Sequence, residues 1–169
     1  GASLYGFEIE AFKKLGNLAE ELEDFTLGLN FGKVISDVEL RQSNRDLRSS
    51  AGLSTERPLQ GQPDYTFNVN VSYDNKDYGL NAAILLNVTG PLLYQVGGNL
   101  GSAIVPDVYQ RTYTSLDVSV SKDLFDGWKL NLRASNLLNS ARERYYPNDV
   151  PASVLKFGTV YSIGLSKEW

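Results

Sequence analysis

The sequence lacks three residue types, two of which many catalytic and metal sites need. It contains no cysteine, no histidine and no methionine in 169 residues. Without cysteine, neither a disulfide framework nor a thiolate metal site can form. Without histidine, Ser/His and Cys/His nucleophile pairs, imidazole zinc motifs and the usual general base near neutral pH are excluded. The composition therefore argues against an enzyme, and no cofactor is expected.

Basic charge and long apolar runs are also scarce. The formal net charge is -4 and no basic stripe is present, so nucleic acid is not an expected partner. The longest apolar run, Ala82 to Leu86, is far below the roughly 20 residues that a transmembrane helix needs. The opening Gly1-Ala2-Ser3 lacks the segments of a signal peptide. We therefore expect an interior piece of a longer precursor, which would cross a membrane only as strands.

Alternation of apolar and polar residues is what the sequence has in abundance. In each of several segments the apolar residues fall on one parity, which predicts strands with one apolar and one polar face. The clearest case is 65–73, where Tyr65, Phe67 and Val69 interleave with Thr66 and Asn68. The expected strands cover about 4–13, 24–39, 65–73, 78–89, 115–121, 128–135 and 157–169.

Short and long connections alternate between these segments. The short ones are 14–23, 74–77 and 122–127, and the intervening ones are much longer. This order predicts an up-and-down meander with all long loops at one end, which a Greek-key sandwich would not require. The apolar spacing from Leu15 to Glu23 indicates a short turn of helix within the first connection.

Aromatic residues lie on the apolar parity near the short-connection end of most strands. Aromatic rings are favoured where hydrocarbon meets lipid headgroups, so a ring of them at one level predicts the girdle of a barrel in lipid. The alternative is a set of unrelated core aromatics in a soluble barrel. The predicted girdle consists of Phe25, Tyr73, Tyr78, Trp128 and Trp169.

These patterns predict an all-β fold, an antiparallel up-and-down transmembrane β-barrel segment that extends over residues 1–169. The short turns would face the periplasm and the long loops the exterior. About seven strands leave two unpaired edges, which lipid does not tolerate. We therefore expect the remaining strands of the barrel to lie outside this chain.

Several stretches resemble the TonB-dependent outer-membrane receptors, and together they cover essentially the whole chain. Leu4-Tyr5-Gly6-Phe7-Glu8-Ile9-Glu10 is similar to the family's Tyr-Gly-x-Glu-x-Glu strand, and Gln62-Pro63-Asp64-Tyr65 to the entry of a late barrel strand. Four further stretches resemble the family's penultimate hairpin, namely Ser115-Leu116-Asp117, Ser121-Lys122, Trp128 and Ala134-Ser135-Asn136-Leu137-Leu138-Asn139. Tyr161-Ser162-Ile163-Gly164-Leu165 with Trp169 is similar to the final strand.

The resemblance implies the C-terminal part of a barrel of about 22 strands around an N-terminal plug, with the plug and earlier strands absent here. It implies energised uptake of a scarce solute, such as a siderophore, across the outer membrane of a Gram-negative bacterium. The implied partners are the rest of the barrel and its plug, TonB acting through the plug region, the barrel-assembly machinery, and outer-membrane lipid with lipopolysaccharide. The alternating residues that resemble the barrel-assembly signal are Tyr161, Ile163, Leu165 and Trp169.

Two of the expected long loops contain candidate ligand-binding residues. Guanidinium groups in the first loop could meet an anionic ligand such as a metal chelate, and the last loop could line a binding vestibule. Solvated or lipopolysaccharide-facing loops, and simple loop packing, are the alternatives. The candidates are Arg41, Arg45 and Arg48 in the first loop, and Arg142, Arg144, Tyr145 and Tyr146 in the last.

Two other readings of the whole chain stay open. A small autonomous outer-membrane barrel with a structural or adhesive role would need an eighth strand, from Leu92 to Val105, although Gly97 and Gly98 make that stretch a poor strand. A soluble lipocalin-like binder would turn the apolar parity inward. The polar parity is rich in Gly, Ser, Asn and Thr, which suits a lumen better than a solvent-facing surface.

Overall fold

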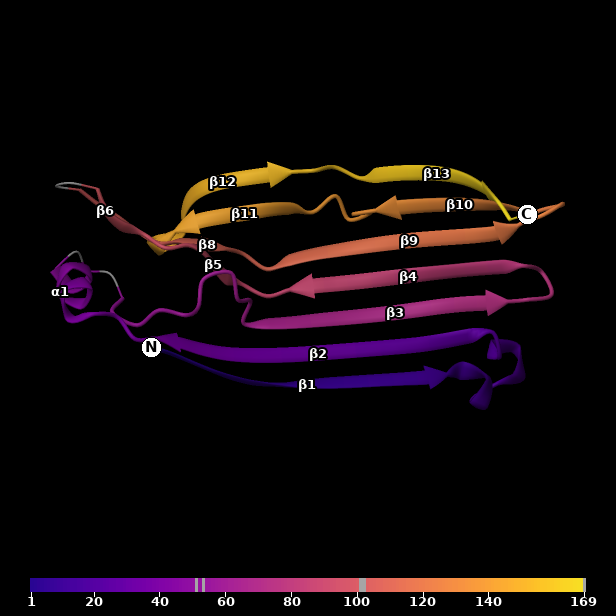
Figure 1. Ribbon diagram of the computed structural model, residues 1–169, viewed down its shortest axis with the longest axis horizontal. Helices are drawn as coiled ribbons and strands as arrows, with labels where there is room; N and C mark the ends of the chain where they lie inside the picture. Colours follow the sequence, from indigo (N-terminus) through magenta and orange to yellow (C-terminus); the bar gives the residue numbers. More distant parts are fainter. Residues whose placement is uncertain (51, 53, 101–102, 169) are drawn as a thin grey trace.

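The structure, a computed structural model, describes residues 1–50, 52, 54–100 and 103–168. Its main feature is a seven-stranded antiparallel sheet, here the main sheet, with the order β1-β2-β3-β4-β9-β10-β13 (Figure 1). Each inner strand of this sheet pairs antiparallel with both of its neighbours, and β1 and β13 form the two edges, so the predicted meander is confirmed. Its strands are β1 (Ala2–Lys14), β2 (Phe25–Val38), β3 (Tyr65–Asn75), β4 (Leu80–Thr89), β9 (Tyr113–Asp123), β10 (Trp128–Ser135) and β13 (Val160–Lys167).

The short and long connections lie at opposite ends of the main sheet, as the sequence predicts. The short-turn end holds the connections 15–24, 76–79 and 124–127. The first contains two 3-10 turns, η1 (Leu15–Asn17) and η2 (Glu20–Leu22), where a short helical turn is expected. The long-loop end contains α1 (Gln42–Ser50) and η3 (Pro147–Asp149). In the described ranges no helix has the length and apolar character needed to cross a membrane.

Strands also occur at the long-loop end, where the sequence predicts only loops. β5 (Leu92–Gln95), β8 (Val108–Gln110), β11 (Ala141–Tyr146) and β12 (Val150–Lys156) form a second sheet, here the upper sheet. Its order, β12-β11-β8-β5, repeats the order β13-β10-β9-β4 of the main sheet. The upper sheet therefore continues four strands of the wall beyond a break in each, as Figure 1 shows.

The stretch from Leu92 to Val105 does not supply an eighth strand of the main sheet. It is divided among β5, β6 (Gly98–Leu100) and β7 (Ala103–Val105), and β6 pairs only with β7. The expectation of an eighth wall strand there, on which the small autonomous barrel depends, is therefore wrong. The physical reason is the glycines of this stretch, Gly97 and Gly98 among them, together with the prolines that flank it, Pro91 and Pro106, which favour short strands.

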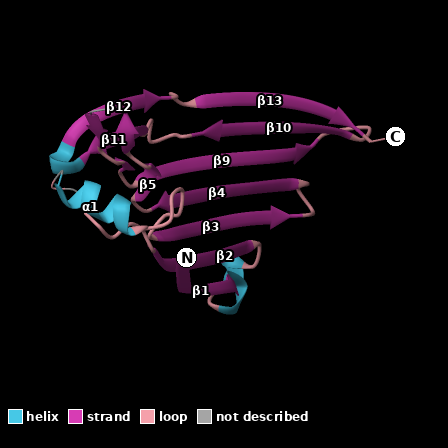
Figure 2. Ribbon diagram, turned by 60° about the vertical axis from the view of Figure 1, so that its left-hand side comes forward, coloured by secondary structure: helices cyan, strands magenta, loops and turns pink. Residues whose placement is uncertain are grey.

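The register places the two parities on opposite faces of the main sheet. Leu29, Val69, Leu86 and Leu116 lie opposite one another along one row of the apolar parity. A recess of about 480 Å³ lies on the polar-parity face and extends from β1 to β10, with Asn30, Asn70, Asp117 and Arg133 among its lining residues beside Phe12 and Leu85. Figure 2 shows that the sheet is curved, and the recess places the polar parity on its inner face. This arrangement contradicts the lipocalin-like reading, which requires the apolar parity inside.

Few apolar side chains in the described part of the chain are buried. Leu93, which is 1 % exposed, is the only fully buried apolar residue there, whereas Ile163 on the apolar face is 76 % exposed. A soluble protein would bury such a surface, because apolar area in contact with water is costly. The main sheet therefore has an apolar outer face that suits lipid and a polar inner face that suits an aqueous lumen.

Candidate functional site

Three of the five residues of the predicted aromatic girdle lie on the apolar parity at the short-turn end, and the girdle itself stays a prediction. Phe25 of β2 and Tyr73 of β3 are register partners, and their ring centroids are 4.9 Å apart. Trp128 begins β10 on the apolar parity, opposite Lys167. Tyr78 lies in the turn before β4 rather than in the strand, with its backbone amide bonded to Asn75 Oδ1. Trp169 lies outside the described residues.

A second group of aromatic residues at the long-loop end was not predicted. Phe7 of β1 and Phe31 of β2 lie on the apolar face with ring centroids 6.0 Å apart. Phe31 faces Phe67, and Tyr65 begins β3 one row farther out. The signal was present in the sequence, because these residues share the apolar parity with the predicted girdle. The apolar face is therefore bounded by aromatic residues at both ends.

A chain of side-chain hydrogen bonds crosses the inner face. Asn87 of β4 donates through Nδ2 to Asn68 of β3 at 2.5 Å, and Asn68 donates to Asn30 of β2 at 3.2 Å. Asn30 then donates to Glu8 of β1 at 2.5 Å. Cross-strand contacts of this kind fix register and give the inner face a continuous polar surface. Glu8, the carboxylate at the end of this series of hydrogen bonds, belongs to the Tyr-Gly-x-Glu-x-Glu stretch.

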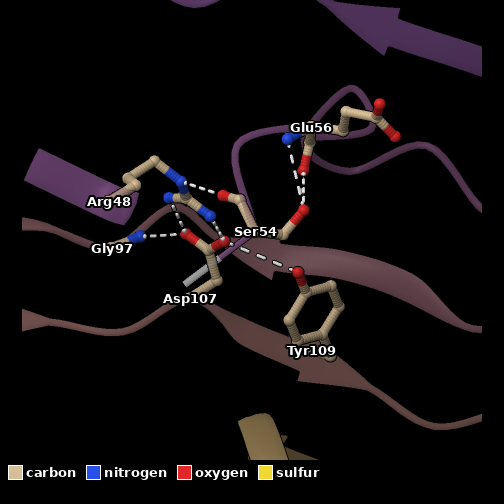
Figure 3. Close-up of polar contacts among 6 residues, drawn as sticks. All are labelled: Arg48, Ser54, Glu56, Gly97, Asp107 and Tyr109. Carbon is tan, nitrogen blue, oxygen red and sulfur yellow. Dashed lines mark hydrogen bonds and ion pairs between the residues drawn. The ribbon is translucent and has the colours of Figure 1, made fainter. Parts of the chain in front are cut away.

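Arg48 of α1 and Asp107, which precedes β8, form an ion pair between two different loops (Figure 3). The guanidinium donates to Oδ1 at 3.1 Å and to Oδ2 at 2.5 Å, in a bidentate geometry that favours arginine. Asp107 is only 2 % exposed. It also accepts the Gly97 amide at 2.8 Å and the Tyr109 hydroxyl at 3.5 Å. We call this cluster the loop clamp, because it fixes loop 39–64 against loop 90–112.

The electrostatics of the loop clamp keep both partners charged. Burial by itself raises the pKa of Asp107, but its bonds to Arg48 and Gly97 and the charges of Arg48 and Arg57 hold the pKa below its ordinary value. The bond to Asp107 raises the pKa of Arg48, although burial opposes this. Burial, followed by the charge of Asp107, raises the pKa of Tyr109. Arg48, a predicted ligand residue, is therefore engaged within the protein.

The candidates in the last loop lie on β11 of the upper sheet and stack on aromatic rings. The Arg144 guanidinium carbon is 3.5 Å from the ring centroid of Tyr94, and that of Arg142 is 4.8 Å from Tyr113. Tyr145 lies beneath Arg111 at 4.6 Å. Tyr146 ends β11 opposite Val150. Cation–π contacts of this kind brace the upper sheet, and they leave the proposed vestibule role of these residues as a prediction.

Arg41 and Arg45 differ from Arg48 in their surroundings. Both are exposed at the long-loop end, Arg41 just before α1 and Arg45 within it. The structure brings them near the loop clamp along the chain but gives them no side-chain bond in the described part. The first-loop candidates thus divide into one structural arginine and two exposed ones.

The open edge of the main sheet carries the residues that resemble the barrel-assembly signal. Tyr161, Ile163 and Leu165 alternate on the apolar face of β13, opposite Ala134, Leu132 and Leu130 of β10. All three are exposed. Trp169 is not among the described residues.

Asn136 organises the break between the main sheet and the upper sheet, a role that the sequence did not predict. Its backbone has φ 55°, and its side chain donates to the carbonyls of Ser140 at 3.2 Å and Gly158 at 2.9 Å. The backbone amide of Asn136 also donates to Asp117 Oδ1 at 2.8 Å. Asn136 therefore connects β9 with the segment between β10 and β11 and with the segment between β12 and β13. Asparagine tolerates this left-handed conformation better than most residues.

The fold and its two faces define a class of protein, the wall of a transmembrane β-barrel. Comparison with protein families identifies the family: residues 1–137 match the family described as TonB dependent receptor-like, beta-barrel. The match extends over most of the chain, which therefore belongs to the TonB-dependent receptors. These receptors are outer-membrane transporters of Gram-negative bacteria rather than enzymes. Comparisons with curated proteins and with solved structures found no match.

Proposed function

We propose that this chain is the C-terminal part of the barrel of a receptor that takes up a scarce solute, such as a siderophore, across the outer membrane. TonB, acting through a plug that lies outside this chain, supplies the energy. The short-turn end faces the periplasm and the long-loop end faces the exterior. The remaining strands of the barrel pair with the open edges of β1 and β13.

The observation that carries this proposal is the polarity of the wall. The inner face bears the asparagine chain and the recess lined by Asp117 and Arg133. The outer face bears apolar rows bounded by aromatic residues. A polar lumen inside an apolar belt suits passage of a water-soluble solute past a plug. Membership of the receptor family supports the same reading.

The long-loop end is the proposed entrance for the solute. There the loop clamp holds α1 against the segment that precedes β8, and the cation–π stacks brace the upper sheet. Arg41 and Arg45 are exposed on this rigid base, and their guanidinium groups suit an anionic metal chelate. The arginines and tyrosines of β11 line the same entrance from the upper sheet.

The proposed assembly role of β13 has separate support. Its outer edge is unpaired in the main sheet, and its apolar side chains are exposed. An amphipathic edge strand can add to another sheet by β-augmentation. We propose that the barrel-assembly machinery reads this strand before the barrel closes.

Transport is tested with the complete receptor in its own bacterium. Uptake of radiolabelled ferric chelates, cobalamin and oligosaccharides is compared in the parent strain, a strain lacking the receptor and a strain lacking TonB. The proposal predicts that uptake of one ferric chelate falls to background in both deletion strains. Unchanged uptake without TonB, with loss only on removal of the receptor, would indicate a passive pore and overturn the proposal.

A further inference from the structure

Charged residues on the apolar face of the main sheet lie toward its two ends, with Lys33 and Asp37 of β2 in the half nearer the long loops. The centre of this face is formed by residues such as Leu29, Val69 and Leu86. At the short-turn end, three strands each place a lysine at their last position on this face. Lys13 lies opposite Leu27, Lys122 opposite Leu80 and Leu130, and Lys167 opposite Trp128. Register partners share a face, so these lysines border the lipid-facing surface.

Acidic residues at the same end lie on the other face or in the turns. Asp123 of β9 faces Lys129 of β10 on the polar parity, and their side chains form an ion pair at 3.3 Å. Asp74 of β3 faces Asn81 of β4, also on the polar parity. In the described strands, the apolar face thus ends in lysines at this boundary and carries no carboxylate there.

Local contacts hold two of the three ammonium groups toward the turns. Lys122 Nζ donates to the carbonyl of Tyr78 in the turn 76–79. Lys167 Nζ is 2.9 Å from Asp126 Oδ2 in the turn 124–127 and 5.6 Å from the centroid of the Trp128 ring. Their stems therefore lie along the apolar face while their charges reach the boundary, which is the snorkelling geometry of lysine at an interface.

We propose that Lys13, Lys122 and Lys167 form a binding rim for anionic phospholipid headgroups of the inner leaflet of the outer membrane. The ligand atoms are phosphate oxygens, which accept hydrogen bonds from ammonium groups. An ammonium has three donors, so the bond from Lys122 to a carbonyl is compatible with a phosphate contact. Basic residues near a membrane surface attract anionic lipid individually and additively. The assignment rests on the proposed orientation, in which the short-turn end faces the periplasm.

The rim is tested on the complete receptor, reconstituted in bilayers of phosphatidylethanolamine with phosphatidylglycerol. Spin-labelled forms of each lipid report the relative association constant at the protein surface. The test variant is K13Q/K122Q/K167Q. The matched control, K14Q/K76Q/K129Q, removes the same charge from the same end, at two strand positions of the polar parity and one turn. Single K13Q provides a second test, because the side chain of Lys13 makes no hydrogen bond or ion pair to another described residue and its loss should not disturb folding.

The rim predicts that the wild-type receptor prefers phosphatidylglycerol and that the test variant loses this preference severalfold, up to about fivefold for each lysine. K13Q should lose part of it, and the control should retain it. An equal preference in the wild type and the test variant, or an equal loss in the control, would overturn the proposal. The transport proposal fails on a different readout, namely the absence of TonB-dependent uptake by the wild-type receptor.

Discussion

Arg48 and Asp107 are far apart in the sequence, yet their side chains meet in a part-buried bidentate pair. Arg48 comes from α1 and Asp107 from the approach to β8, so the pair connects the loop between β2 and β3 with the loop between β4 and β9. Arg48 Nε also donates to the Ser54 carbonyl at 2.5 Å. One ion pair therefore organises both the fold of the first long loop and its contact with the second.

Replacing Asp107 with asparagine should release α1 from the upper sheet. The change leaves a part-buried guanidinium without its counter-charge, at a cost of about 3 kcal/mol. Hydrogen exchange of amides 42–50 in the complete receptor should accelerate about 100-fold. D46N is the control, because Asp46 accepts only an exposed bond from Gln42. Equal exchange in D107N and the wild type would show that the clamp does not hold the helix.

The loop clamp should be insensitive to pH across the neutral range. The pKa of the Asp107 carboxyl lies below its ordinary value of 3.8, so its contribution to stability is complete above that value and is lost as the pH falls below it. The raised pKa of Arg48 and of Tyr109 removes their contributions only in strong base. Protection factors of α1, corrected for intrinsic exchange, should be constant from about pH 5 to 9. A loss of protection between pH 7 and about pH 5 would contradict this account.

Alanine at position 136 should destabilise the barrel more than alanine at position 139. Both asparagines have positive φ, 55° and 51°, so both substitutions introduce backbone strain. Only Asn136 also loses side-chain bonds, to Ser140 and Gly158. The difference in the free energy of unfolding should be about 2 kcal/mol, measured from urea midpoints of the receptor in lipid vesicles. Equal midpoints would mean that the Asn136 side chain contributes nothing.

The double variant R41A/R45A should weaken binding of an anionic ferric chelate about tenfold without lowering stability. Both guanidinium groups are exposed, so their loss removes ligand contacts rather than packing. Titration of the complete receptor measures the affinity. K76A removes a charge at the opposite end and should bind as the wild type does. Unchanged affinity in R41A/R45A would assign the two arginines to a solvated loop.

The main sheet could be predicted because strand geometry leaves a strong signal in the sequence. Each strand has period two, so residues such as Phe67, Val69 and Val71 must lie on one face together. Lipid requires that face to be apolar over its whole height, which keeps the alternation regular. The same parity also contained the aromatic residues at the long-loop end, although only those at the short-turn end were predicted.

The long-loop end could be predicted less well, because contacts with several neighbouring segments determine which way its side chains point. In β11, Arg142, Glu143 and Arg144 follow one another, and their faces are set by ring stacking and ion pairs rather than by lipid. The loop clamp depends on contacts between loops distant in the sequence, and a single aspartate such as Asp107 gives no local sign of its partner. The parity of Tyr78 predicts a strand residue. In the structure Tyr78 lies in the turn 76–79, and β4 begins only at Leu80.

The central claim is that residues 65–73 separate lipid from lumen by parity, and spin-label scanning tests it most directly. Because this chain has no cysteine, single cysteines can be introduced along β3 of the complete receptor in lipid bilayers and labelled with a nitroxide. Collision with oxygen should dominate at 67, 69 and 71, and collision with a water-soluble nickel chelate at 66, 68, 70 and 72. The opposite phase, or access of the nickel chelate at every position, would contradict the account.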